Sequence, residues 1–287
     1  MKIHELYRDR FTLSFEIFPP KTPAGEEKLM EALAVFAAHD PGFISVTYGA
    51  GGSTREKTLE LSLKIRDRFG ITPLAHFTCV GAGRKDIADY LGEVKRQGIE
   101  NILALRGDPP QGEKEFTPAP DGFAHADELV AYIRSINGFT IGVAGYPEGH
   151  MEAPDLDTDI ENLKKKVDAG ADFIITQLFY HNEDFYTFID KITKLGITVP
   201  VIPGIMPVTS MAQVERVTGM CGAKVPGELI ERLKRCATED QLCAAGVEYS
   251  IKQCEELRSW GVRGFHFYPL NKSAAVARIL ASLNPVL

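Results

Sequence analysis

Short apolar runs alternate with helical patterns along this chain, and that alternation constrains its fold more than any other feature. Apolar runs with the length and residue types of β-strands occupy 12–18, 43–48, 73–79, 101–106, 139–146, 172–178, 199–204 and 263–268. Helical spacing occurs between them in 29–36, 54–69, 84–97, 125–137, 157–169 and 182–195. Strands that alternate with helices in this way indicate parallel βα units.

Eight βα units that close on themselves predict an α/β fold, the (β/α)₈ or TIM barrel, as a single catalytic domain over residues 1–287. The stretch 209–260 is longer than one crossover needs, so extra helices are expected between the seventh and eighth strands, including 226–236 and 239–259. A last helix is expected at 272–283. The alternative is a doubly wound open sheet, whose GxGxxG fingerprint would follow the first strand. That strand is followed here by PPKTP.

Composition excludes several classes of function. The net charge is −7 and there is no basic stripe, which argues against a nucleic-acid-binding protein. The five cysteines form no CxxC pair and no zinc-type spacing with histidine, so we predict no metal site. No apolar run is long enough to span a bilayer, and MKIHELYRDR has no signal-peptide core. We therefore expect a cytoplasmic protein with reduced thiols.

The first predicted strand carries one carboxylate, Glu16, in the sequence FEIFPP. Pro19 and Pro20 end the strand because they lack the N–H that a ladder needs. A carboxylate in an apolar strand is costly unless it is paired, hydrogen-bonded or protonated. At this point two interpretations remain open: an exposed glutamate at a strand end, or a general acid with a raised pKa.

Polar residues gather at the carboxyl ends of the predicted strands, where barrel enzymes place their active sites. Seven of the eight ends contribute: Glu16; Thr47 and Tyr48; His76 and Thr78; Arg106, Gly107 and Asp108; Tyr146, Glu148 and His150; Gln177; and Tyr268, Asn271 and Lys272. This favours an enzyme over a scaffold. No GxSxG and no cysteine–histidine nucleophile pair occurs, which suggests that an organic cofactor carries the chemistry.

Two features bear on cofactor binding. The turn GAGGST at 49–54 is neither a Rossmann nor a Walker loop, and Ser53 with Glu56 predicts a capping box at the next helix. On helix 157–169, Asp159, Asn162 and Lys166 share one face. That face is either solvated or a polar strip for a ribose and a pyrophosphate, with Arg106, Lys165 and Lys166 as the cations.

Taken together, eight motifs resemble the methylenetetrahydrofolate reductase family. They are FEIFPP, SVTYGAGGSTRE, HFTC, LALRGDPP, YPEGH, LKKKVDAGADFIITQLF, IPGIMP and HFYPLN. The resemblance implies a flavoprotein that holds FAD and reduces 5,10-methylenetetrahydrofolate to 5-methyltetrahydrofolate, with NADH or NADPH as the donor in a ping-pong cycle. It places the protein in the one-carbon metabolism that leads to methionine. The match covers the catalytic barrel alone, so we expect the short bacterial form without the regulatory region that binds S-adenosylmethionine.

The resemblance also assigns residues. Glu16 matches the general acid that protonates folate N10, and Asp108 matches a carboxylate near the flavin and the pterin. The substrate contacts are Glu16, Asp108, Gln177, Gln213, Tyr268 and Lys272, although the family form has Arg at the position of Lys272. The FAD contacts are Thr47, Tyr48, Ala50, His76, Arg106, Gly107, Asp108, Ala124, His125, Tyr146, His150, Ala153, Asp159, Asn162, Lys165 and Lys166. The aromatic residue expected to stack on adenine after IPGIMP is not evident, and Met211 and Val217 stand nearby.

Two further hypotheses remain beside the reductase. One is a pterin-dependent methyltransferase, or another flavin enzyme, on the same barrel. The other is a flavin- or folate-binding subunit that receives electrons from an iron–sulfur partner. We expect a homo-oligomer, either a dimer or a tetramer, and the sequence leaves the choice between NADH and NADPH open.

Overall fold

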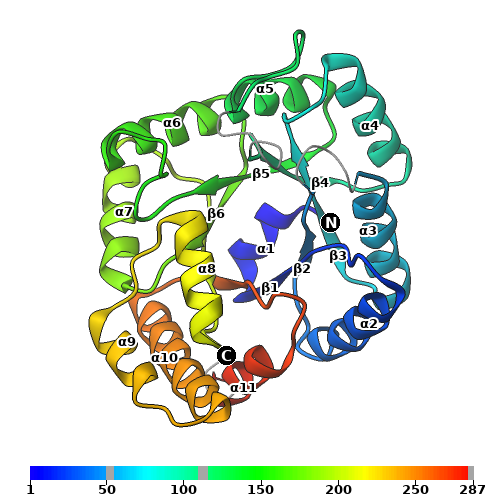
Figure 1. The fold of residues 1–287 in the computed structure, drawn as a ribbon. Helices are drawn as coiled ribbons and strands as arrows, with labels where there is room; N and C mark the ends of the chain where they lie inside the picture. Colours follow the sequence, from blue (N-terminus) through cyan, green and yellow to red (C-terminus); the bar gives the residue numbers. More distant parts are fainter. Residues whose placement is uncertain (50–54, 109–115, 284–287) are drawn as a thin grey trace.

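A computed structural model describes residues 1–49, 55–108 and 116–283 (Figure 1). Eight parallel strands close into a barrel in sequence order, as predicted. They are β1 Thr12–Ile17, β2 Phe43–Val46, β3 Thr72–Thr78, β4 Asn101–Leu105, β5 Thr140–Gly145, β6 Phe173–Leu178, β7 Val201–Ile205 and β8 Gly264–Phe267. Each predicted strand is confirmed to within two residues at either end.

The described helices surround this barrel, most of them as an outer ring (Figure 1). They are α1 Ile3–Asp9, α2 Pro23–Ala37, α3 Arg55–Phe69, α4 Arg84–Arg96, α5 Ala126–Ile136, α6 Leu156–Asp168, α7 Asn182–Lys194, α8 Met211–Cys221, α9 Gly227–Lys234, α10 Glu239–Trp260 and α11 Ala274–Leu283. The extra helices expected between the last two strands are α8, α9 and α10. None of the helices in the described ranges is long and apolar enough to cross a membrane.

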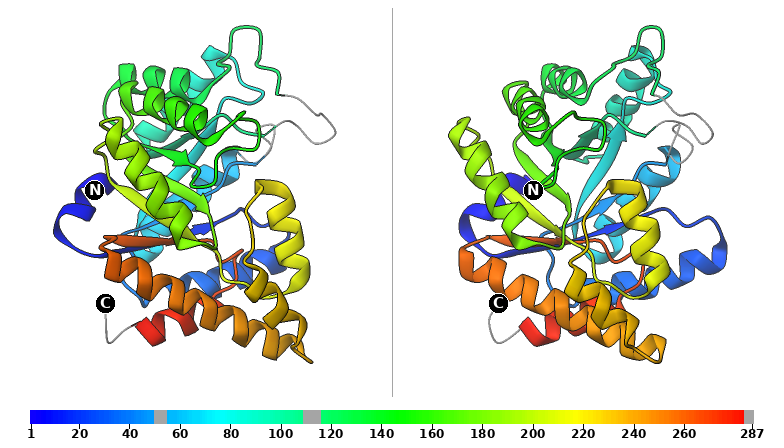
Figure 2. Two further views of the ribbon diagram at one scale, coloured as in Figure 1. Left: turned by 90° about the vertical axis from the view of Figure 1, so that its left-hand side faces the viewer. Right: turned by 60° about the vertical axis from the view of Figure 1, so that its left-hand side comes forward.

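The sequence did not predict α1, which closes the amino-terminal end of the barrel. Its Ile3, Leu6 and Tyr7 are buried against the apolar floor of the barrel interior. Asn101, at the start of β4, accepts a hydrogen bond from the Ile3 amide at 3.1 Å and donates to the Met1 carbonyl at 3.0 Å. Figure 2 shows α1 at one end of the barrel and α8 at the other. Any site open to solvent is therefore at the carboxyl end.

Side chains of β1 alternate between the two faces of the barrel wall, as a strand requires. Phe15 and Ile17 point outward into the helix layer, where Phe15 stacks on Phe36 with a centroid separation of 4.5 Å. Full burial of a phenylalanine of this kind contributes about 2–3 kcal/mol. Ser14 and Glu16 point inward, paired in register with His266 of β8 and Ser45 of β2. A polar layer therefore lies above the apolar floor.

Candidate active site

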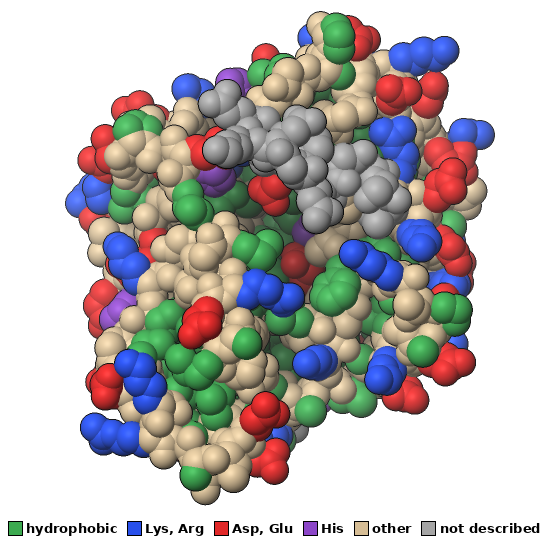
Figure 3. All heavy atoms as spheres, viewed as in Figure 1, with side chains coloured by type: hydrophobic (Ala, Val, Ile, Leu, Met, Phe, Trp, Pro, Cys, Tyr) green, Lys and Arg blue, Asp and Glu red, His purple; other side chains and the backbone are tan. Residues whose placement is uncertain are grey.

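The inward-facing polar layer centres on Glu16. Its carboxylate Oε2 lies 3.5 Å from His76 Nε2 and 3.8 Å from His266 Nε2. Both histidines are buried, and the Glu16 side chain is 24% exposed, so the carboxylate is the part of the cluster that solvent reaches. Figure 3 shows acidic and histidine side chains in a hollow near the middle of this face. A carboxylate that is open to ligands and backed by imidazoles can exchange a proton with a substrate.

Neighbouring strands hold His266 in place. Ser14 Oγ lies 2.8 Å from its Nδ1, and Ser45 Oγ lies 3.5 Å from its Nε2. The Phe43 ring stacks on the imidazole at a centroid separation of 5.8 Å. Because β8 lies between β1 and β7 in the closed barrel, residues from the first and last strands meet here. The ring therefore has little freedom to turn away from Glu16.

The raised pKa that one of the two interpretations gave to Glu16 is wrong for this structure. Burial alone raises the pKa of Glu16, but the interaction with His266 and the charges that His76 and His266 carry when protonated outweigh burial. The pKa of Glu16 therefore lies below its usual value, and the group is ionised near neutral pH. The prediction failed because FEIFPP looks apolar along the chain, whereas its inward face meets two imidazoles.

His76 is neutral at physiological pH. Burial lowers the pKa of His76 to about 4, although the nearby Glu16 charge favours the protonated ring. Its Nε2 has no hydrogen-bond partner among the described residues, and neither does the buried Oγ1 of Thr78, two residues further along β3. Buried polar atoms without partners are costly. They mark the wall between β3 and β4 as a surface that a polar ligand would satisfy.

Tyr268, just beyond β8, crosses the barrel mouth. Its hydroxyl donates to the Thr176 carbonyl at 2.7 Å, and its ring lies over Gly204. A Cβ on Gly204 would come within 2.5 Å of that ring, so glycine is required in β7 at this point. Burial raises the pKa of Tyr268 far above its usual value, so the hydroxyl stays protonated. Gln177 lies on β6 next to Thr176, and its Oε1 accepts from the Leu178 amide at 2.9 Å.

The turn after β4 presents Arg106 and Asp108 at the mouth. Gly107 between them has φ +91°, and a Cβ there would lie 2.9 Å from Thr78 Cβ, so only glycine fits. Arg106 forms a bidentate ion pair with Glu152 at 2.5 and 2.7 Å. Asp108 is exposed and near enough to Arg106 to raise the pKa of that guanidinium, after the larger effect of Glu152. An anionic ligand of Arg106 would compete with Glu152.

A second cavity of about 340 Å³ opens between the ends of β4 and β5 and helix α6. Nine residues predicted to bind FAD line it: Arg106, His125, Tyr146, His150, Ala153, Asp159, Asn162, Lys165 and Lys166. The structure thus brings together residues from four separate segments. Its long polar wall, with cationic and aromatic side chains, suits a ligand that carries phosphates and a sugar.

Asp159 and Lys166 show that this face of α6 is not simply solvated. Asp159 is buried, and burial raises the pKa of its carboxyl. Burial also lowers the pKa of the Lys166 ammonium to about 8, while its Nζ donates to the Ala144 carbonyl at 2.7 Å. Asn162 and Lys165 are exposed and bonded to each other at 2.9 Å. The strip therefore runs from the buried Asp159 and the half-buried Lys166 to the exposed Asn162 and Lys165 across the cavity wall.

Several predicted site residues either point away from the barrel mouth or are hydrogen-bonded to other parts of the protein. The Tyr48 ring packs outward against Phe77 and accepts a hydrogen bond from Arg55, so its side chain does not face the mouth. Thr47 follows β2, and its amide donates to the Ile17 carbonyl. The Gln213 side chain bonds to Thr209 and to the Pro207 carbonyl, and so closes the turn after β7. To make the predicted contact with folate, the Gln213 side chain would have to release one of these hydrogen bonds.

Five predicted positions complete the account. The Ala124 and His125 amides both donate to the Glu128 carboxylate, at 2.7 and 3.0 Å, where α5 begins. Lys272 is exposed in the turn after β8 and has no ion pair among the residues the structure describes. Ala50 and the predicted capping residue Ser53 lie outside the described residues.

Sequence reasoning missed Ser14, Ser45, His266 and Glu152. Three of them lie within quoted motifs or directly beside one, and the period of two places Ser14 on the same face as Glu16 and His266 on the same face as Tyr268. That signal was present in the sequence. Glu152 had no comparable signal, because it follows β5 in an irregular loop and reaches Arg106 only in three dimensions.

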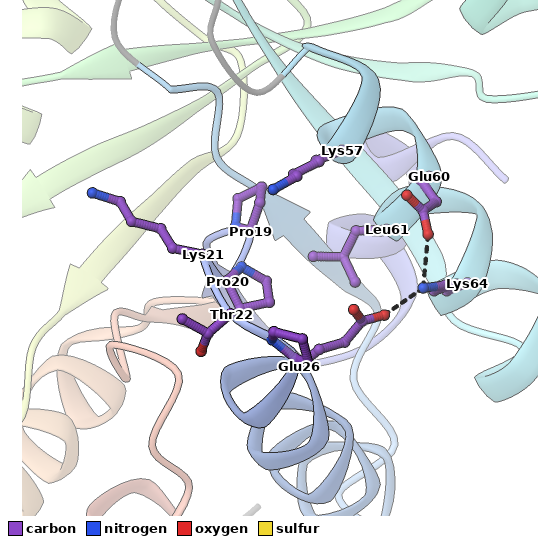
Figure 4. Close-up of a pocket in the computed structure, with 10 residues that line it drawn as sticks. Pro19, Pro20, Lys21, Thr22, Glu26, Lys57, Glu60, Leu61 and Lys64 are labelled. Atoms are coloured by element: carbon purple, nitrogen blue, oxygen red, sulfur yellow. Dashed lines mark hydrogen bonds and ion pairs between the residues drawn. The ribbon is translucent and has the colours of Figure 1, made fainter.

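A groove of about 220 Å³ lies outside this site, between the turn that follows β1 and helix α3. Figure 4 shows Lys64 within it, bridging Glu26 at 2.5 Å and Glu60 at 2.8 Å. Lys21 points away from that ion pair, on the other side of Pro20. The charge of Lys64 is therefore balanced by two carboxylates, while Lys21 and Lys57 also line the groove. Across the described ranges, no group of histidine, cysteine and acidic side chains is arranged to hold a metal ion.

Comparison with known proteins adds independent information. The family model described as methylenetetrahydrofolate reductase matches residues 2–284. A rice protein named probable methylenetetrahydrofolate reductase (NADH) is 40% identical over 295 residues, covering 98% of this chain and 50% of the relative. A 5,10-methylenetetrahydrofolate reductase from Pectobacterium carotovorum is 35% identical over 92% of this chain and 87% of its own length. The chain thus spans about half the length of the plant relatives and most of the bacterial one.

A solved structure supports the fold. An uncharacterised protein from Clostridium thermocellum that binds two copies of 5-methyl-5,6,7,8-tetrahydrofolic acid has a TM-score of 0.66 to this chain, with 16% sequence identity. The match covers 98% of this chain and 96% of that protein. Identity this low indicates a shared fold and no more.

Proposed function

The chain belongs to the methylenetetrahydrofolate reductase family, and from that premise we propose that it reduces 5,10-methylenetetrahydrofolate to 5-methyltetrahydrofolate. The cofactor is FAD and the donor is NADH, with NADPH as the alternative. The names of the plant relatives, which specify NADH, support that choice of donor. One observation carries the proposal: Glu16 stands at the mouth of the barrel with two imidazoles within 4 Å.

Glu16 is the proton donor to folate N10 in this proposal. An amine nitrogen leaves a carbon readily only after it is protonated, and a positioned carboxylic acid supplies that proton. Within the protein Glu16 is ionised near neutral pH, because its contacts with the two imidazoles lower its pKa. A bound folate would cover the remaining 24% exposure of Glu16, and added burial favours the neutral acid. In this proposal, binding of the folate therefore raises the pKa of Glu16, and the carboxylate takes up a proton that it can pass to N10.

The cavity beside α6 is the proposed place for the cofactor. When bound, FAD supplies hydride transfer between the nicotinamide and the folate. Lys166 and Arg106 face the cavity as cations for its phosphates, and Asp159 is an acceptor for a ribose hydroxyl. His76 Nε2 and Thr78 Oγ1, which make no hydrogen bond among the described residues, fit a polar ring edge at the boundary of the two sites. These residues bind and orient, and Tyr268 helps to close the mouth.

Asp108 and the remaining substrate residues act on the folate in this proposal. A carboxylate at the mouth stabilises positive charge that develops on the folate as the ring opens. Gln177 and Tyr268 border the mouth from β6 and from the end of β8, and in this proposal Lys272 binds a substrate carboxylate. We also retain from the family resemblance a cytoplasmic homo-oligomer and, as the alternative electron source, an iron–sulfur partner.

An absorption spectrum of the purified protein, taken before and after anaerobic NADH, tests the proposal. We expect a flavin spectrum that bleaches with NADH and recovers when 5,10-methylenetetrahydrofolate is added. A flavin that ignores NADH contradicts the donor and favours electrons from a partner. A colourless protein that takes up no FAD contradicts the reductase and favours the methyltransferase alternative.

A further inference from the structure

We propose that Phe18 is the surface against which the aromatic ring of the folate packs, and that Asn271 is the residue that positions Phe18. This inference rests on the proposed function and specifies a part of its substrate site. Neither residue is among the predicted contacts, although Asn271 was noted at the rim.

Phe18 is an unusual surface residue. Its side chain is 42% exposed, and the structure gives it no ring–ring contact within the described residues. Trp260, the other exposed aromatic of this size, is stacked on Tyr186 at 4.9 Å. An exposed phenylalanine without an aromatic partner leaves most of its ring face for a ligand.

The strand period places Phe18 above Glu16. Ser14 and Glu16 point into the barrel, whereas Phe15 and Ile17 point outward. Phe18 directly follows the end of β1 and precedes Pro19, which favours extended backbone, so we infer that the alternation continues and that the Phe18 side chain faces inward. Residues two apart on a strand are about 6.6 Å apart. The ring therefore stands at the mouth, one step outward from the carboxylate.

The chemistry of folate fits this spacing. N10, the atom that Glu16 protonates, is bonded directly to the benzene ring of the p-aminobenzoyl group. With N10 at the Glu16 carboxylate, that ring begins one bond away and extends outward. Aromatic rings interact favourably at centroid separations of about 4.5–7 Å. Phe18 is thus at the right height to contact the ring while Glu16 contacts the nitrogen.

Asn271 fixes the Phe18 backbone from the opposite side of the barrel seam. Its side-chain amide accepts from the Phe18 N–H at 3.0 Å and donates to the Phe18 carbonyl at 2.8 Å. Asn271 has φ +59° and the preceding Leu270 has φ +51°. Left-handed backbone is costly for residues other than glycine, and asparagine tolerates it better than most. Two such residues in succession indicate that the surrounding structure holds this turn in the conformation in which Asn271 forms both hydrogen bonds with Phe18.

Ligand truncation tests the role of Phe18. The flavin-loaded full chain would be titrated with 5-methyltetrahydrofolate, and 6-methyltetrahydropterin, which lacks the p-aminobenzoyl ring, would be measured by competition. We expect Phe18→Leu to weaken binding of the folate about tenfold and to change binding of the pterin less than twofold. Phe18→Tyr, which keeps the ring, should bind both ligands as the wild type does.

Two results would overturn the role of Phe18. Equal losses for folate and pterin in Phe18→Leu would mean that the ring contact is not the cause, and no loss for either would remove the contact altogether. A wild-type protein that binds no 5-methyltetrahydrofolate would instead contradict the proposed function. Retention of FAD by each variant reports that the fold is intact.

A double-mutant cycle tests Asn271. Asn271→Gly keeps a residue suited to positive φ and removes both bonds to Phe18, so we expect folate binding to weaken about fivefold. In the Phe18→Leu background the same change should add less than twofold. Asn137→Gly is the matched control, because Asn137 also has φ +57° but caps α5 away from the rim. Full additivity in the cycle would show that Asn271 acts independently of Phe18.

Discussion

Two buried acid–base clusters in this barrel respond to burial in opposite ways. At Glu16, contacts with imidazoles outweigh desolvation, so the pKa of the carboxyl falls and the group stays charged. Along α6, desolvation wins: the pKa of Asp159 rises and that of Lys166 falls to about 8. In the first cluster the carboxylate is stabilised by the two imidazoles, and its pKa should rise when a ligand removes solvent from it. In the second cluster the attraction between Asp159 and Lys166 does not offset the cost of burying their charges. An anionic ligand beside Lys166 would stabilise its charged form.

The largest effect that would break this comparison is expected at Glu16. Glu16→Gln removes the proton donor and keeps the shape, so folate reduction should fall about 10³-fold, within the usual range for a general acid. Flavin reduction by NADH should persist, because that step needs no proton at N10. Stopped-flow measurement of the two half-reactions separates them. Equal loss in both would remove Glu16 from the acid role.

Lys166→Met is the next largest change and probes the α6 cluster. Loss of one buried cation facing phosphates should weaken FAD binding about tenfold. In the wild type, Lys166 loses its proton as pH rises through about 8, so FAD affinity should fall between pH 7 and pH 9. Equilibrium dialysis across this range should show a flat profile for Lys166→Met. An equally steep profile in the variant would assign the pH dependence to another group.

Asp159→Asn should have a smaller effect. Burial raises the pKa of Asp159, and the amide that replaces the carboxyl retains an acceptor for a hydroxyl. We expect FAD to dissociate about threefold faster on dilution. Asn162→Ala, at the exposed end of the same strip, is the matched control and should change the rate less. Unchanged FAD retention in Asp159→Asn would return this face of α6 to a purely structural role.

The smallest expected effect is the loss of folding stability in acid, compared between the wild type and Glu16→Gln. A carboxyl whose pKa is lowered in the folded state stabilises the fold above its unfolded pKa, and that contribution is lost as pH falls through the folded pKa. For Glu16 the direction is downward. The free energy of unfolding, from urea titrations at pH 7 and pH 3, should therefore decline more for the wild type than for Glu16→Gln. A larger decline for the variant would contradict the lowered pKa.

The sequence was sufficient for the barrel because strand and helix periods are local properties. All eight strands follow from runs of residues that the chain carries in order, whereas α1, with seven residues, was too short to stand out. The rim was predictable for the same reason, since a strand end is a local feature. The pKa of Glu16 was not, because its sign depends on distances to His76 and His266 that only closure of the barrel sets.

The pairing of the first strand with the last has a consequence for how the protein is made. Ser14 and His266 touch, yet 252 positions separate them along the chain. At typical synthesis rates of about 5–20 residues per second, roughly 13–50 s pass between the production of these two residues. During that interval Glu16 lacks one imidazole, and Phe18 lacks its hydrogen bonds with Asn271. A nascent chain thus contains Glu16 before it contains His266, which lowers the pKa of Glu16. The lowered pKa of this carboxyl is therefore a property of the closed barrel.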